Sequence, residues 1–191
     1  MNLNNDINFL LRLKKFCQRQ EFRLVISGGY GLDANLGSIS RPHHDIDAII
    51  YGQLSRKRAG LLLPKFINQL FPHPTISIHE NDFMLAIDIN SPGFGANLYF
   101  VETAHDPQQD INTLILKNGK QHKNNKQLFL PPVTGNLLGH KFEAQNPNFH
   151  LADILSKQSI NKQAKHDIDI TNLRKITSPK LVNKLLLLLT T

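Results

Sequence analysis

Hydrophobic and polar positions follow two different periods along this chain, which together predict a mixture of helices and strands. Apolar residues three or four positions apart indicate an amphipathic helix, whereas short apolar runs that end at glycine indicate buried strands. In the first part of the chain we expect a helix over residues 7–17, a strand over 22–27, a short helix over 30–36, a strand over 46–51 and a helix over 55–71.

The second part of the chain adds hairpins and then helices. Two strands are expected over residues 83–89 and 98–102, joined by a long turn that contains Pro92, Gly93 and Gly95. A second hairpin is expected over residues 113–116 and 127–130, and helix is expected from Thr134 onward. This order predicts an α/β (α+β) fold with a small mixed sheet in a lobe of residues 1–132, and a helical lobe of residues 133–191 packed on it.

Charge and composition limit the kinds of partner and the location expected for this protein. Lys and Arg number 22 against 15 Asp and Glu, so the formal charge is +7, which is typical of proteins with an anionic partner such as nucleotide phosphates or nucleic acid. No apolar run approaches the roughly 18 residues of a membrane span, and the N-terminus lacks the order of a secretory signal. We therefore expect a cytoplasmic protein without a membrane partner. The single cysteine, Cys17, excludes an internal disulfide framework.

The segment from Ser27 to Tyr51 carries the candidate chemistry. Gly28 and Gly29 follow a predicted strand and open a helix, where backbone N–H groups can point at an anion without a side chain in the way. Asp45 and Asp47 flank Ile46 at the start of the next strand, and residues two apart in a strand share a face. Two carboxylates held there repel one another unless a cation lies between them. Mg²⁺ prefers carboxylate oxygens together with substrate phosphates.

This segment resembles the nucleotidyltransferase superfamily of the DNA polymerase β type, and more closely its aminoglycoside and lincosamide branch. The resemblance rests on Gly28, Gly29, Leu32, Asp33, Arg41, His43, Asp45, Ile46 and Asp47. It implies transfer of a nucleoside monophosphate from an NTP to an acceptor hydroxyl, with two Mg²⁺ ions held by Asp45 and Asp47. Ser27 or the amides of Gly28 and Gly29 would then cradle the β- and γ-phosphates.

The resemblance also implies a third carboxylate on a later strand, which would bind metal and accept the proton of the acceptor. In related sequences this acid lies on the second strand of the hairpin. That position favours Glu102, with Asp88 as the alternative. Glu102 has a longer side chain than the more usual Asp, which shifts the carboxylate by about one bond length.

Basic residues of the same motif and of the C-terminal region complete the candidate site. Arg41 either pairs with Asp33 or contacts phosphate, and His43 is expected to support the fold. Lys141, expected on a helix, and Lys165 resemble tail lysines of related nucleotidyltransferases and abortive-infection toxins, which implies contact with the triphosphate.

Three functions are compatible with the sequence. The +7 charge and the basic segment from Lys117 to Lys126 favour an RNA or protein acceptor, as in toxin nucleotidyltransferases. An antibiotic acceptor is the alternative, and an aminoglycoside, being a polycation, would favour a more acidic cleft. A non-catalytic nucleotide-binding module is the third possibility, if the third carboxylate is not competent.

Overall fold

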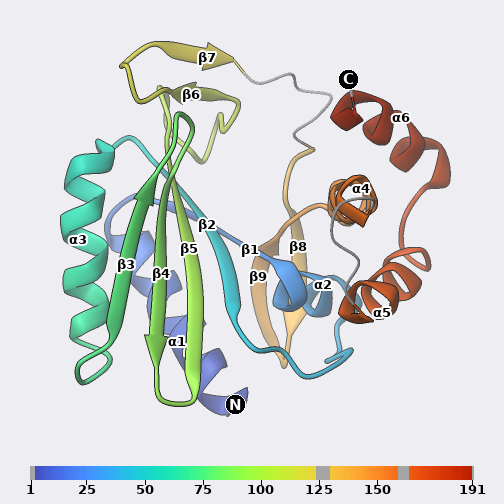
Figure 1. Cartoon of the computed structure of the whole chain (residues 1–191), viewed down its shortest axis with the longest axis horizontal. Helices are drawn as coiled ribbons and strands as arrows, with labels where there is room; N and C mark the ends of the chain where they lie inside the picture. Colours follow the sequence, from blue (N-terminus) through green and yellow to red (C-terminus); the bar gives the residue numbers. More distant parts are fainter. Residues whose placement is uncertain (1–2, 124–129, 159–163, 191) are drawn as a thin grey trace. The chain divides into compact units, whose positions relative to one another are not determined.

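The structure is a computed structural model that describes residues 3–123, 130–158 and 164–190 (Figure 1). The helices are α1 (Leu3–Arg19), α2 (Gly28–Leu36), α3 (Arg56–Asn68), α4 (Pro147–Gln158), α5 (Ala164–Leu173) and α6 (Pro179–Thr190). The strands are β1 (Arg23–Ser27), β2 (Ile46–Gly52), β3 (Thr75–Glu80), β4 (Leu85–Ser91), β5 (Phe94–Glu102), β6 (Thr113–Ile115), β7 (Gln121–Lys123), β8 (Val133–Leu137) and β9 (His140–Ala144). The predicted mixed α/β class is confirmed.

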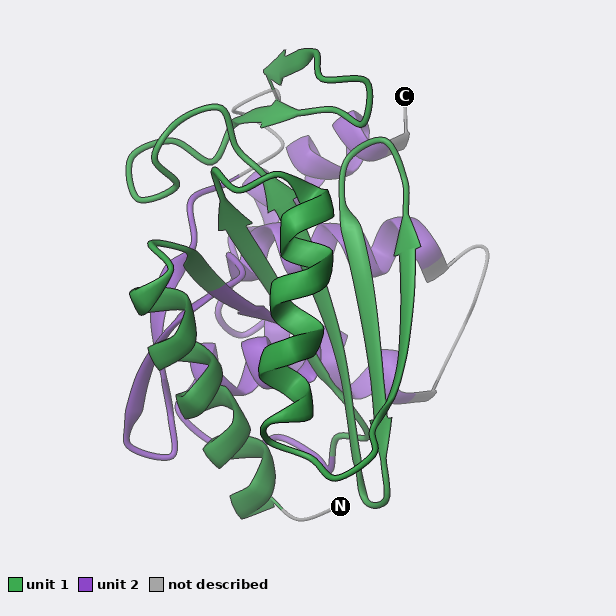
Figure 2. Cartoon of the chain, turned by 90° about the vertical axis from the view of Figure 1, so that its left-hand side faces the viewer, with its two compact units in different colours: residues 1–24, 43–124 green, residues 25–42, 125–191 purple. Residues whose placement is uncertain are grey.

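Contacts along the chain divide it into two compact units (Figure 2). Unit 1 consists of residues 1–24 and 43–124, and unit 2 consists of residues 25–42 and 125–191. The division differs from the expected boundary near residue 132, because α2 packs with β8, β9, α4 and α5 and so joins the C-terminal part of the chain.

Unit 1 contains strands in the order β3-β4-β5-β2, with β2 and β5 parallel and the other neighbouring pairs antiparallel. Alternate residues of β2, β4 and β5 are buried, and α1 and α3 lie on that apolar face (Figure 2). Phenylalanines join the layers: the rings of Phe9 and Phe94 lie 4.9 Å apart, and those of Phe71 and Phe94 lie 4.5 Å apart. The opposite face keeps the polar side chains of the strands.

Unit 2 contains strands in the order β1-β9-β8, with β1 parallel to β9 and β8 antiparallel to it. A Cβ added to Gly135 of β8 would lie 2.4 Å from the carbonyl oxygen of Ala34, so only glycine allows α2 this close. Residues from α2, α4, α5 and α6 form one apolar core: Leu32, Leu151, Ala152, Ile154, Ile170, Leu173, Val182 and Leu185.

The prediction of helix from Thr134 onward is wrong over its first part. Residues 133–144 form the hairpin β8–β9, in which Leu137, Phe142 and Ala144 are buried. Leu138 and Gly139 between the strands have φ of 49° and 83°, the backbone of a tight two-residue hairpin turn. The spacing of the apolar residues in this short segment fits a helix as well as a strand. The tight turn between the two halves favours strands. The predicted helices after it, including the Pro179 start of α6, are confirmed.

Other corrections concern strands. Residues 113–115 pair with β7 at residues 121–123, inside the segment that we expected to connect the two strands of the second hairpin. Residues 127–129 of the predicted partner strand lie outside the described part of the chain. Strand β3 was not predicted, although Ile76 and Ile78 alternate with polar residues. None of the described helices combines the length and hydrophobicity needed to cross a membrane.

Candidate active site

Strand β2 of unit 1 begins at the predicted acid pair. Asp47 lies on β2 and Asp45 immediately precedes it, while the intervening Ile46 is fully buried. Both carboxylates are therefore on the polar face of the strands, where they are partly exposed. The predicted placement of Asp45 and Asp47 on one face is consistent with this geometry.

Strand register aligns Asp47 with polar residues of three neighbouring strands. Asp47 is paired with Asn97 of β5, Asn97 with Asp88 of β4, and Asp88 with Ser77 of β3. Directly paired residues point to the same face of a sheet. We call these four residues, Asp47, Asn97, Asp88 and Ser77, the acid row.

Asn97 connects the two aspartates. Its side-chain nitrogen Nδ2 donates one hydrogen bond to Asp45 at 3.1 Å and one to Asp47 at 3.0 Å. The amide oxygen cannot replace the nitrogen there, because it would face two carboxylate oxygens. One uncharged side chain thus positions both acids and leaves their negative charge in place.

Asp88 extends the acidic surface of unit 1, next to the uncharged phenol of Tyr99. Asp88 Oδ2 lies 3.6 Å from Nε2 of His79 on the neighbouring strand. Tyr99 lies two residues after Asn97 and therefore on the same face. Burial, together with the nearby charges of Asp47, Asp88 and Asp45, raises the pKa of Tyr99. The three aspartates thus create a local negative field on a protein whose net charge is +7.

Glu102 lies away from the acid pair. Its partner in register is Gly52, five residues beyond Asp47 on β2. One carboxylate oxygen of Glu102 accepts a hydrogen bond from the backbone N–H of Arg56 at 3.2 Å and lies 4.0 Å from the Arg56 Nε atom. Arg56 is 3% exposed and also donates to the carbonyl oxygens of Asn81, Asp82 and Ile115. The structure therefore places Asp88, and not Glu102, in the acid row.

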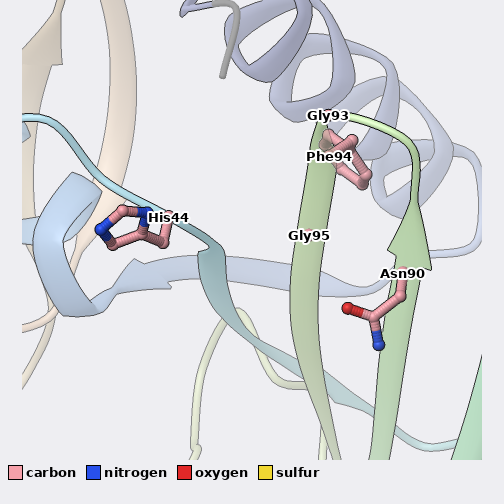
Figure 3. A pocket seen from close by; sticks show the side chains of 5 residues that line it. All are labelled: His44, Asn90, Gly93, Phe94 and Gly95. Carbon is pink, nitrogen blue, oxygen red and sulfur yellow. The ribbon is translucent and has the colours of Figure 1, made fainter.

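A small hollow adjoins the acid pair in unit 1. It has a volume of about 280 Å³ and is lined by His44, Asn90, Gly93, Phe94 and Gly95. Figure 3 shows the side chains of His44 and Asn90 on either side of the β5 segment at Gly95. A Cβ added to Gly95 would lie 3.8 Å from the Cβ of Asp45, so this lining residue of the hollow is close to the first aspartate.

The Gly-Gly turn begins α2 of unit 2. Ser27 is extended and buried, and Gly28 has φ of 57°, a left-handed conformation that favours glycine. Amides of a first helical turn have no partner within the helix, and no acidic residue occupies this first turn. Ser27, Gly28 and Gly29 thus have the backbone arrangement expected of an anion-binding turn.

Arg41 takes a partner that sequence proximity did not indicate. Its guanidinium forms two hydrogen bonds of 2.8 Å with the carboxylate of Asp169 on α5, a planar bidentate pair that is almost buried. Asp33, the expected partner, accepts hydrogen bonds from the backbone N–H and the hydroxyl of Ser40 at 2.9 and 2.6 Å. The Asp169 pair agrees with a structural role for Arg41.

The remaining candidate residues differ in exposure. Lys141 is exposed and lies on strand β9, not on the expected helix, and Lys165 is exposed on α5. His43 is 5% exposed, in keeping with support of the fold.

Unit 2 also contains a buried histidine with a shifted pKa. Burial lowers the pKa of His150 on α4 to about 4, although Asp169 and Asp153 act in the opposite direction.

Asn97 is the site residue that sequence reasoning missed. It carries no charge and belongs to a segment, residues 90–97, that we expected to be a turn. The signal was the strict alternation of buried residues through Phe94, Ala96, Leu98 and Phe100, which continues the strand on both sides of Asn97.

The donor set agrees with a magnesium ion that is shared with a substrate. Within the described ranges, no group of three or more His, Cys, Asp or Glu side chains is arranged to hold a metal ion. Asp45 and Asp47 supply two carboxylates, and Mg²⁺ in nucleotide enzymes is commonly held by one or two carboxylates with substrate phosphates. The residues therefore fit a cation that enters with a triphosphate.

Comparisons with known proteins begin with the sequence around this site. Residues 9–63 match the model of the aminoglycoside-2''-adenylyltransferase family, a stretch that contains both the Gly-Gly turn and the acid pair. Among curated proteins, none matches the sequence. The predicted resemblance to the aminoglycoside branch of nucleotidyltransferases is thus supported by a family model over this part of the chain.

Solved structures extend the likeness over nearly the whole chain. The solution structure of the antibiotic-resistance factor ANT(2'')-Ia is 15% identical with a TM-score of 0.67, covering 98% of this chain and 92% of that one. The crystal structure of ANT(2'')-Ia with adenylyl-2''-tobramycin has 15% identity, a TM-score of 0.65 and 97% coverage of both chains. The lincomycin-bound lincosamide antibiotic adenylyltransferase LnuA has 15% identity and a TM-score of 0.62, with coverage of 93% and 99%. The chain therefore has the nucleotidyltransferase fold.

Proposed function

We propose that this protein is a metal-dependent nucleotidyltransferase that moves a nucleoside monophosphate from an NTP to a hydroxyl group of a small molecule. The observation that carries the proposal is the acid pair: Asp45 and Asp47 lie on one face and share the amide of Asn97. The fold, and the family model over residues 9–63, support the same reaction class.

In this proposal, the acidic residues of unit 1 have different roles in metal binding and proton transfer. Asp45 and Asp47 would hold magnesium, two ions with a bound NTP, and the metal would supply positive charge to the triphosphate and the departing pyrophosphate. Asp88 shares the acid row with Asp47 and replaces Glu102 as the candidate third carboxylate. It lies two strands from Asp47, about 10 Å between Cα atoms, which suits acceptance of the acceptor's proton better than binding of the same ion.

Unit 2 supplies anion-binding groups of its own. The buried Ser27 and the amides of Gly28 and Gly29 at the start of α2 are proposed to bind phosphate oxygens. The exposed Lys141 and Lys165 are retained as candidate triphosphate contacts. Arg41 is proposed to act through the fold, because its guanidinium is committed to Asp169.

Two observations favour a small acceptor over the RNA or protein that the net charge suggested. Two of the similar structures are a complex with adenylyl-2''-tobramycin and a complex with lincomycin. In addition, the surface around the acid pair is negative, with three aspartates on one face of unit 1. A local negative field attracts amine-bearing small molecules and repels the phosphates of RNA. The hollow of about 280 Å³ beside Asp45 is proposed to hold part of such an acceptor.

The test is transfer of label from each α-³²P-labelled NTP in the presence of Mg²⁺. Acceptors are offered in separate reactions: aminoglycosides, lincosamides, total RNA and a protein lysate. We expect label on a small molecule with the wild type and none with the Asp45→Asn/Asp47→Asn double variant. Label on RNA or protein would overturn the assignment of the acceptor. If no acceptor is labelled although the protein binds NTP, the proposal of an enzyme would be wrong, and the protein would be a nucleotide-binding module.

A further inference from the structure

Asn97 gives the acid pair an unusual composition. Two carboxylates and one carboxamide lie together, and the carboxamide nitrogen uses one hydrogen for each acid, at 3.1 and 3.0 Å. The nearest further acid of the row, Asp88, is separated from Asp47 by Asn97 itself. The position at which a third carboxylate would contact both aspartates is therefore taken by an uncharged hydrogen-bond donor.

This composition has two physical consequences. First, the two N–H groups of Asn97 partly offset the repulsion between the aspartates, so the pair keeps its geometry without a cation. Second, the protein offers few anionic oxygens to an ion. Mg²⁺ requires near-octahedral coordination by oxygen and loses its water reluctantly, so two carboxylates alone bind it weakly.

We infer that Asn97 is a positioning residue that holds Asp45 and Asp47 as a two-carboxylate site, which binds a divalent cation firmly only together with a nucleoside triphosphate. The inference rests on the proposed function, whose donor substrate supplies the missing phosphate oxygens. It goes further in assigning a binding order: cation and nucleotide enter as a coupled pair. Coupling is reciprocal, so each ligand raises the affinity for the other by the same factor.

The direct test measures Mn²⁺ binding by electron paramagnetic resonance or calorimetry, with no acceptor present and no turnover. The wild type is titrated with Mn²⁺ alone and with Mn²⁺ plus a saturating non-hydrolysable NTP analogue, after correction for the metal that the free analogue binds. We expect at least about a tenfold higher affinity of the protein for Mn²⁺ with the analogue, equivalent to about 1.4 kcal/mol of coupling.

The decisive variant is Asn97→Asp, which has the same shape and replaces the donor by a third carboxylate. We expect it to bind Mn²⁺ without nucleotide about tenfold more tightly than the wild type, because three acids now converge on one point. Its melting temperature without metal should fall through charge repulsion and recover when Mn²⁺ is added. The matched control is Asn68→Asp, the same substitution at an exposed position of α3, which lies on the opposite, apolar face of the strands. It should leave Mn²⁺ affinity unchanged within about twofold.

Two results would overturn the inference. One is equal Mn²⁺ affinity of the wild type with and without the analogue. The other is an Asn97→Asp variant that binds Mn²⁺ no better than Asn68→Asp. If Asn97→Asp does not fold, the wild-type comparison alone still decides. Failure of the proposed function gives a different result. A protein that transfers no label but binds Mn²⁺ and nucleotide with positive coupling would support this inference and contradict only the proposed reaction.

Discussion

Two groups of carboxylates in unit 1 have opposite surroundings. Glu102 lies beside the buried guanidinium of Arg56, which also contacts Glu80 at 3.5 Å. Asp45 and Asp47 lie beside the uncharged amide of Asn97. A carboxylate next to a buried cation is neutralised and serves the fold, whereas a pair held by an amide keeps its charge for a ligand. The neighbour of an acid, more than its presence on a strand, thus indicates its role.

Unit 2 repeats the neutralised arrangement. Asp169 is paired with Arg41 through two hydrogen bonds, and its side chain is 5% exposed. His150 is also buried in this unit and remains neutral near physiological pH, because desolvation lowers its pKa. We therefore expect substitutions in these groups to change stability, and substitutions at the acid pair to change chemistry.

The largest expected effect is on activity at the acid pair. Asp45→Asn should lower nucleotidyl transfer about 1,000-fold, equivalent to about 4 kcal/mol, because one of two metal-binding charges is lost. Its melting temperature should stay within about 2 °C of the wild type, since like-charge repulsion is also removed. Single-turnover transfer and thermal unfolding measure the two effects. A large drop in melting temperature would show that Asp45 serves the fold as well.

The next effect is on stability at Arg56. Arg56→Met should lower the free energy of unfolding by about 3 kcal/mol, because three carbonyl oxygens lose a buried donor and Glu80 and Glu102 lose a cationic neighbour. The expected fall in melting temperature is about 6–12 °C. Lys57→Met, the matched control, removes the same charge from the exposed neighbouring position and should change the melting temperature little. Equal effects of the two variants would contradict the assigned role.

A smaller, pH-dependent effect is expected at His150. Its pKa is about 4 in the folded chain, below the ordinary value of 6.5. Between pH 4 and pH 6.5 the unfolded chain therefore binds a proton at this histidine that the folded chain does not bind. Stability should therefore fall as pH decreases from 6.5 to 4, by about 2–3 kcal/mol from this group. Denaturant unfolding of the wild type and of His150→Gln measures the difference. The exposed His140→Gln control should retain the wild-type slope, and an unchanged slope in His150→Gln would refute the prediction.

The smallest effect is expected at Glu102. Glu102→Gln keeps an oxygen that accepts the backbone N–H of Arg56 and loses only a long ion pair of 4.0 Å. We expect a loss of about 1 kcal/mol or less in the free energy of unfolding. Denaturant unfolding checks this value. A loss as large as that of Arg56→Met would show that Glu102 carries most of the Arg56 interaction.

Several strands and the acid pair were predictable from local patterns. The apolar runs before Gly28 and Gly52 gave β1 and β2, and the spacing of Asp45 and Asp47 placed them on one face. The third acid was harder, because its identity depends on strand register. We expected a turn over residues 90–97, but Ser91 pairs with Phe94 and leaves only Pro92 and Gly93 between the strands. That shorter turn brings Asn97 beside Asp88, and the separate pairing of β5 with β2 brings it beside Asp47, with Glu102 five residues further along.

Long-range contacts were beyond the sequence patterns. Arg41 and Asp169 are 128 residues apart, so no local spacing indicates their pair. The hairpin β8–β9 was misassigned because its apolar residues are few and its direction is set by the turn at Leu138 and Gly139. Such features depend on which elements meet in the folded chain.

The most direct test of this account compares Asp47→Asn with Glu102→Gln in the same assay. Transfer of label from the preferred NTP to its acceptor is measured under single-turnover conditions, at a temperature where both variants are folded by circular dichroism. The account predicts a loss of about 1,000-fold for Asp47→Asn and less than about threefold for Glu102→Gln. A comparable loss in Glu102→Gln would contradict it and would identify Glu102 of β5 as the third carboxylate.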